Sequence, residues 1–192
     1  MTACSDDSAS SKPKRIAQID HLTGRTTAVK LDKGFLDALK SLELTPGVVG
    51  KAELTKAGSL VLPISAGNVT YFKPGTVSPY VQGNIQHVGS GLSLSAGGTE
   101  VELTDFEIDP GTSKLYGNVA VNNEPAVDHA FLFQLDGSTL KPLRAAKKTA
   151  ILQGTKVEVS KDAAPLLNKT FKTDAVKPLQ LVGIATITIN TK

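Results

Sequence analysis

Apolar residues recur at every second position within short runs between residues 81 and 121 of this chain. The runs are separated by glycine, by asparagine or by Asp109-Pro110-Gly111. A period of two is typical of half-buried antiparallel strands, and these separators favour tight turns. We therefore predict a meander of about four strands in this segment, with one hairpin turn at Ala96-Gly97-Gly98.

The flanking segments add further strands and two short helices. The strands are predicted at residues 26–31, 48–54, 59–64, 69–72, 130–135, 150–152, 155–159 and 179–189. Asp32 and Ser160 each precede an apolar stripe with helical spacing, which predicts two N-capped amphipathic helices. The fold class predicted is mainly β, an antiparallel β-sandwich or meander with two short covering α-helices.

Composition narrows the possible functions. The chain has 192 residues, of which 40% are hydrophobic, and we expect a single β-rich domain over residues 16–192. The net charge of +3 and the scattered lysines argue against nucleic acid as a partner. The sequence contains no run of 18 apolar residues, so it predicts no membrane-spanning helix.

The only cysteine, Cys4, follows Thr2-Ala3 and precedes a small polar stretch. This pattern resembles the end of a bacterial lipoprotein signal, in which the cysteine is lipidated. We therefore expect residues 1–15 to be a disordered tether that holds the domain at a membrane surface through Cys4. The alternative is an ordinary free cysteine in a polar tail.

The sequence does not predict a catalytic site, and we expect a non-enzyme. His21, His87 and His129 are far apart in the chain and lie at no metal-ligand spacing, so no metal site is predicted. Acidic residues alternate along the meander, which is typical of the solvent face of a sheet. A hydrolase or calcium site built from these carboxylates remains the less favoured alternative.

A series of short motifs resembles a known family. The motifs are Gly34-Phe35, Leu62-Pro63, Gly83-Asn84-Ile85, Gly91-Leu92-Ser93-Leu94 and Leu115-Tyr116-Gly117-Asn118-Val119. Their order over residues 28–121 resembles the HtaA-type domain of Gram-positive cell-surface haem-uptake proteins. The resemblance implies a β-rich domain that binds haem through a tyrosine of the first helix, supported by a histidine.

The two positions that would hold haem iron differ in this chain. Ala38 stands at the matching helix position, and Ser90 stands in place of the histidine. A phenolate ligand would therefore have to come from Tyr71, Tyr80 or Tyr116, with His87 as its partner. These four residues are the candidate ligand-binding set.

Two functions follow from these patterns. The first is a non-catalytic bacterial cell-surface lipoprotein, which is extracytoplasmic and membrane-anchored. It would bind a ligand or serve as a scaffold in the cell envelope, with an envelope protein as its partner. The alternative is a carrier of haem or of a hydrophobic small molecule, of the HtaA-like type.

Overall fold

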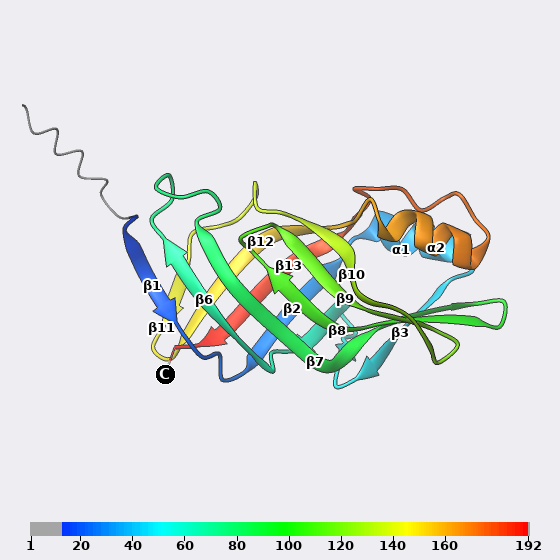
Figure 1. Ribbon diagram of the computed structural model, residues 1–192, viewed down its shortest axis with the longest axis horizontal. Coiled ribbons are helices and arrows are strands. Elements are labelled where there is room, and N and C mark those ends of the chain that lie inside the picture. The colour runs from blue at the N-terminus through cyan, green and yellow to red at the C-terminus, as the bar shows by residue number, and fades with distance from the viewer. Residues whose placement is uncertain (1–12, 192) are drawn as a thin grey trace, which may run out of the picture.

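The computed structural model describes residues 13–191, which form one continuous antiparallel sheet and two helices (Figure 1). The helices are α1 (Lys33–Ser41) and α2 (Ala163–Phe171). The strands are β1 (Arg15–Ile19), β2 (Arg25–Leu31), β3 (Thr45–Gly50), β4 (Glu53–Leu54), β5 (Ser59–Pro63), β6 (Ala66–Phe72), β7 (Val81–Ala96), β8 (Thr99–Asp109), β9 (Lys114–Val121), β10 (Glu124–Asp136), β11 (Arg144–Ala146), β12 (Thr149–Val159) and β13 (Leu181–Asn190). The mainly-β prediction with two short helices is confirmed.

The sheet curls into two facing layers. Its strand order is β1-β6-β7-β8-β9-β10-β12-β13-β2-β5-β4, with β3 added to β7 and β11 added to β12. The curl brings β7 opposite β2, because a side chain of β7 hydrogen-bonds one of β2 although no backbone ladder joins the two strands. The arrangement is a β-sandwich made from one curled sheet.

The meander between residues 81 and 121 contains three long strands, fewer than the sequence predicts. The two apolar runs on either side of Gly89 belong to the single strand β7. Gly89 lies at a bulge, where the register between β7 and β8 shifts. The backbone N–H of Gly89 donates to the Asp105 carboxylate at 2.8 Å, so a side chain satisfies the backbone group that the bulge leaves unpaired.

β10 begins earlier than the sequence pattern predicts. Asn122 and Asn123 form the turn between β9 and β10, and both have positive φ (50° and 67°). This is the backbone of a two-residue hairpin, in which asparagine is tolerated. The strand therefore starts at Glu124, and the polar residues that follow extend the hairpin instead of forming a loop.

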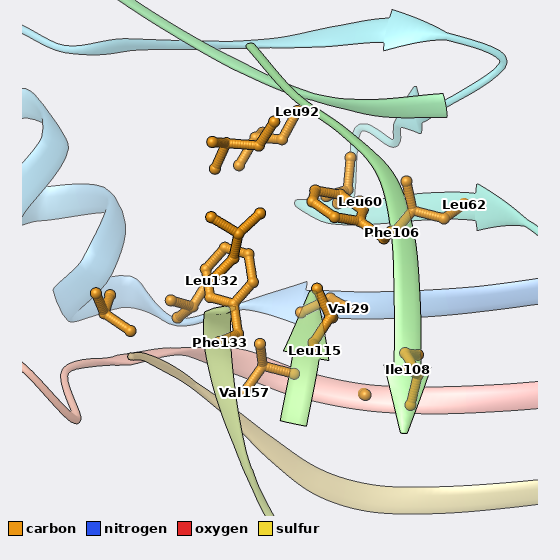
Figure 2. Close-up of a cluster of buried hydrophobic side chains, with 14 of the residues drawn as sticks. Val29, Leu60, Leu62, Leu92, Phe106, Ile108, Leu115, Leu132, Phe133 and Val157 are labelled. Atoms are coloured by element: carbon orange, nitrogen blue, oxygen red, sulfur yellow. The ribbon is translucent and has the colours of Figure 1, made fainter. Parts of the chain in front are cut away.

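Aliphatic and aromatic side chains from both layers fill the core (Figure 2). Leu92, Phe106 and Leu115 meet Leu60 and Val29 of the facing layer there. Phe106 and Phe133 pack edge-on, with ring centroids 6.2 Å apart. In β8 and β9 the buried side chains alternate as the sequence pattern predicts.

The two helices lie side by side at one end of the sheet (Figure 1). The Asp32 carboxylate accepts hydrogen bonds from the backbone N–H groups of Gly34 and Phe35, at 2.8 and 3.2 Å, and so caps α1. Ser160 precedes α2, and its Oγ accepts from Ala163 N at 2.9 Å. Asp32 is thus confirmed as the N-cap of α1, whereas Asp162 stands directly before α2 without a capping side-chain bond and Ser160 caps the turn that leads into the helix. Neither helix of the described chain is long and apolar enough to cross a membrane.

Candidate ligand-binding cavity

A cavity of about 570 Å³ lies between the two layers of the sheet. Side chains from ten strands line it, namely those of β1, β2, β5, β6, β7, β8, β9, β10, β12 and β13. Residues of the loops at 78–80, 110–113 and 137–143 and Thr191 after β13 complete the lining, whereas no lining residue comes from α1 or α2. The volume falls within the range of roughly 300–1,000 Å³ that is usual for small-molecule sites.

The lining is apolar and carries no formal charge. Among the described residues that line the cavity, none is Asp, Glu, Lys or Arg, and most are Val, Ile, Leu, Ala or Pro. The polar lining groups are hydroxyl, amide and ring nitrogen groups, such as those of Thr155, Gln18 and His87. An apolar enclosure with a few polar atoms favours an uncharged ligand or the uncharged part of one.

His87 of β7 is fully buried in the wall of this cavity. Its Nδ1 lies 3.2 Å from the carbonyl oxygen of Phe106, which can only accept, so Nδ1–H is the donor. The other nitrogen, Nε2, lies 2.9 Å from Thr27 Oγ1 and accepts the hydroxyl proton when the ring is neutral. Burial lowers the pKa of His87 to about 4, and the weaker effect of the Phe106 carbonyl opposes this shift.

Tyr71 and Tyr80 lie together on the cavity wall, close to the loop between β6 and β7. Their rings meet edge-on, with centroids 5.7 Å apart at 85°. Burial raises the pKa of Tyr80, and the neighbouring Tyr71 raises it further. The hydroxyl form of Tyr80 is therefore favoured over the phenolate.

Tyr116, the fourth candidate, lies on the outer side of the sheet. Its ring stacks on His129 at a centroid distance of 4.5 Å and contacts Phe131 at 5.9 Å. The ammonium of Lys114 lies 5.0 Å from the centre of the Phe131 ring. Of the four predicted residues, the structure thus brings Tyr71, Tyr80 and His87 to one cavity and leaves Tyr116 outside it.

The two positions at which the resemblance would place iron ligands also lie away from the cavity. Ala38 lines a small apolar gap between α1, α2 and the sheet, beside Leu42 and Leu167. Ser90 is buried, and its hydroxyl donates to the carbonyl oxygen of His87 at 2.9 Å. Cys4, the predicted lipidation site, lies outside the described residues.

Some lining residues have no counterpart in the sequence-based set. Leu140 and Leu143 line the cavity from the segment between β10 and β11, and Lys141 and Arg144 directly follow them. The loop is fixed to β12, since Lys141 N donates to Gln153 O at 2.8 Å and Thr139 Oγ1 donates to Gly154 O at 2.6 Å. The sequence does contain a signal for these residues, because two leucines stand beside basic residues in a loop. Apolar side chains in such a loop indicate that it packs against an apolar surface.

Metal binding has no support in this part of the chain. Across residues 13–191, no group of three or more His, Cys, Asp or Glu side chains is arranged to hold a metal ion. The three histidines are spread over the fold, with only His87 in the cavity wall.

No family model matches the sequence, and no curated protein matches it. The fold is similar to that of the C-terminal domain of HtaA from Corynebacterium glutamicum, with a TM-score of 0.61 and 11% identity over 88% of this chain and 98% of that domain. Heme binding protein HtaB from the same organism gives a TM-score of 0.51 at 9% identity, covering 91% of this chain and 94% of HtaB. The N-terminal domain of HtaA gives 0.50 at 9% identity, covering 88% of this chain and 97% of that domain.

The sequence identities are too low to transfer a ligand from these proteins. The structural similarity nevertheless shows that the fold is the same. The likeness extends well beyond residues 28–121, where the sequence motifs lie, because it covers most of the described chain. In its fold, this chain is an HtaA-like domain.

Proposed function

We propose that this chain is a non-catalytic binding protein that holds an apolar small molecule between the two layers of its sheet. The observation that carries the proposal is the cavity of about 570 Å³, whose described lining residues include none with a formal charge. A ligand that buries roughly 300 Å² of apolar surface gains about 7 kcal/mol before the cost of association.

A binding role suits the polar groups of the lining better than a catalytic one. His87 is the only histidine in the wall, and both of its ring nitrogens already have partners within the protein. A general base needs a free nitrogen within reach of the substrate. The hydroxyls of Tyr71 and Tyr80 are suited instead to orienting a polar atom of the ligand.

Haem is the second candidate, and it is supported by the similarity to a protein described as heme binding. The ring donors of the cavity fit it poorly. His87 would have to give up Thr27 to reach iron, and the raised pKa of Tyr80 opposes the phenolate that ferric iron requires. We therefore rank an apolar ligand above haem.

A neutral fluorescent probe such as Nile red tests the binding role. We expect saturable binding to the wild type and a loss of at least tenfold in affinity in Ala150→Phe. Ala150 lines the cavity, so the larger ring occupies ligand space. Its neighbour Ile151, which is not part of the lining, provides the matched control. Ile151→Phe should bind the probe as the wild type does. Equal binding by both variants, or none by the wild type, would refute the proposal.

The predicted cellular location is also part of this proposal. Cys4 after Thr2-Ala3, followed by a polar stretch, supports an extracytoplasmic, lipid-anchored protein whose domain faces the cell envelope. Expression of the native gene followed by mass spectrometry of the membrane fraction should find an acylated Cys4. An unmodified Cys4 in that fraction would rule out the anchor.

A further inference from the structure

Basic side chains gather around the end of the cavity that faces away from the helices. On one side are Lys14 and Arg15, at the start of strand β1, which also supplies Ala17 and Gln18 to the lining. Lys73 lies beside them, since its backbone N–H donates to the carbonyl oxygen of Lys14 at 3.0 Å. All three side chains are exposed.

A second group of basic residues approaches from the opposite side. Lys141 and Arg144 flank Leu143, which lines the cavity. Lys148 accepts a hydrogen bond through its carbonyl oxygen from the backbone N–H of Thr191, another lining residue, at 3.0 Å. Figure 1 shows β1, β11 and the end of β13 together at the end of the sheet opposite the helices.

Three acidic residues near this end accept hydrogen bonds, and one of them is paired with a lysine. Asp20 accepts from Gln18 Nε2 at 2.5 Å, and Asp109 accepts from Thr112 Oγ1 at 2.7 Å. Asp136 pairs with Lys156 at 2.9 Å, which with Ser138 lowers the pKa of Asp136 to about 2. The hydrogen bonds leave Asp20 and Asp109 charged, whereas Asp136 is balanced by Lys156. Two carboxylates stand against the basic side chains of Lys14, Arg15, Lys73, Lys141, Arg144 and Lys148, so the rim carries a net positive charge around an uncharged interior.

The rim itself is formed by exposed polar groups without charge. Gln18, Ser78 and Thr191 belong to the lining and are exposed to solvent, so they mark the border between the cavity and water. Tyr80 lies next to Ser78 and Pro79 on the same border. Amide and hydroxyl groups here offer hydrogen bonds to a polar group that stops at the opening.

We propose that the ligand is an anionic amphiphile, with a hydrocarbon tail inside the cavity and an anionic head group at the basic rim. The inference rests on the proposed function, because it assumes that the cavity binds an apolar group. An uncharged interior excludes the head group, since burying an ion without a partner is costly. The surrounding lysines and arginines attract an anion at the opening and repel a cation. A long-chain carboxylate meets both conditions.

Three probes with the same tail separate the two proposals. Dodecanoate, dodecan-1-ol and dodecylammonium are titrated calorimetrically into the full-length protein, at low and at high salt. We expect dodecanoate to bind roughly tenfold more tightly than the alcohol, and the ammonium to bind most weakly, because several exposed positive charges near the opening act together. High salt should narrow the differences, because exposed charges are screened.

Charge reversal at the rim identifies the source of the preference. In the double variant Lys73→Glu/Arg144→Glu, the alcohol should bind as before and the preference for dodecanoate should disappear. The matched control is Lys40→Glu/Lys169→Glu, which makes the same charge change on exposed positions of the two helices. This control should keep at least half of the preference.

Each outcome bears on one of the two claims. Equal affinities of the three probes for the wild type would overturn the anionic head group and leave the apolar cavity intact. A preference that survives in the rim variant would overturn the role of the rim. Failure of all three probes to bind would overturn the proposed function itself.

Discussion

The burial of His87 in the cavity wall has a consequence for the free energy of unfolding that can be measured as a function of pH. Burial lowers its pKa from 6.5 to about 4 in the folded protein. At roughly 1.36 kcal/mol per pKa unit, the difference between 6.5 and 4 corresponds to about 3 kcal/mol. The unfolded chain takes up a proton near pH 6.5, whereas the folded protein does so only near pH 4. The free energy of unfolding should therefore fall by about 3 kcal/mol as the pH decreases from 6.5 to 4.

The substitution His87→Gln isolates this effect from other titrations. Glutamine offers one donor and one acceptor for Phe106 O and Thr27 Oγ1 but carries no titratable proton. The pKa values of Asp37 and Asp136 are lowered from 3.8, so their contributions are lost only below the pH window of His87. The difference in unfolding free energy between wild type and variant should thus shrink by about 3 kcal/mol across that window.

Urea denaturation at a series of pH values measures this difference. His21 is an exposed histidine, so His21→Gln serves as the control and should keep the wild-type pH dependence. A ring-proton NMR titration should place the pKa of His87 near 4. A pKa near 6.5, or a His87→Gln variant that parallels the wild type between pH 6.5 and 4, would refute the assignment of a buried neutral ring.

Three further predictions follow from particular contacts. Gly117→Ala should destabilise the fold by about 1–3 kcal/mol in urea denaturation, because its added Cβ would lie 2.8 Å from Leu132 Cδ1 and from Thr104 O; an unchanged midpoint would contradict this packing. Asp32→Ala should cost about 1 kcal/mol, since it removes the two N-cap hydrogen bonds of α1, and Asp32→Ser should recover most of this loss; an equal loss in both variants would contradict the capping role. Titration with hemin should leave the Soret band of free hemin unshifted, because Nε2 of His87 is bonded to Thr27 and the raised pKa of Tyr80 opposes its phenolate; a sharp, red-shifted band that Tyr71→Phe abolishes would reverse the ranking of the two ligands.

Local features of the fold could be predicted from the sequence. The caps at Asp32 and Ser160 are short-range hydrogen bonds, so the identity of one residue and the apolar spacing after it suffice to locate each helix. The same holds for the inward side of each strand, because the period of two is a property of the extended backbone. The bulge at Gly89 could not be predicted, because a glycine between two apolar runs indicates a turn as readily as a bulge. Which of the two forms depends on the pairing with the neighbouring strand.

The candidate site could be predicted only in part. Tyr116 lies between the inward-facing Leu115 and Gly117, so the strand period already placed it on the outer face, away from His87. The contact between His87 and Thr27 joins residues that are 60 positions apart, and sequence alternation says nothing about which strands will face each other. Alternation also marks a side chain as inward without telling whether the interior is packed or hollow, and so the cavity itself was not predictable.

The most direct test of the account is methyl NMR of the protein with dodecan-1-ol, the uncharged probe. We expect intermolecular contacts from the alkyl chain to the methyl groups of Val69, Leu152 and Ile187 in the cavity. The methyl groups of Leu39 and Leu167, which lie between the helices and the sheet, should show none. Contacts confined to the helix end, or no contacts with any of these methyl groups at saturating probe, would contradict the claim that the curled sheet is a ligand-binding site.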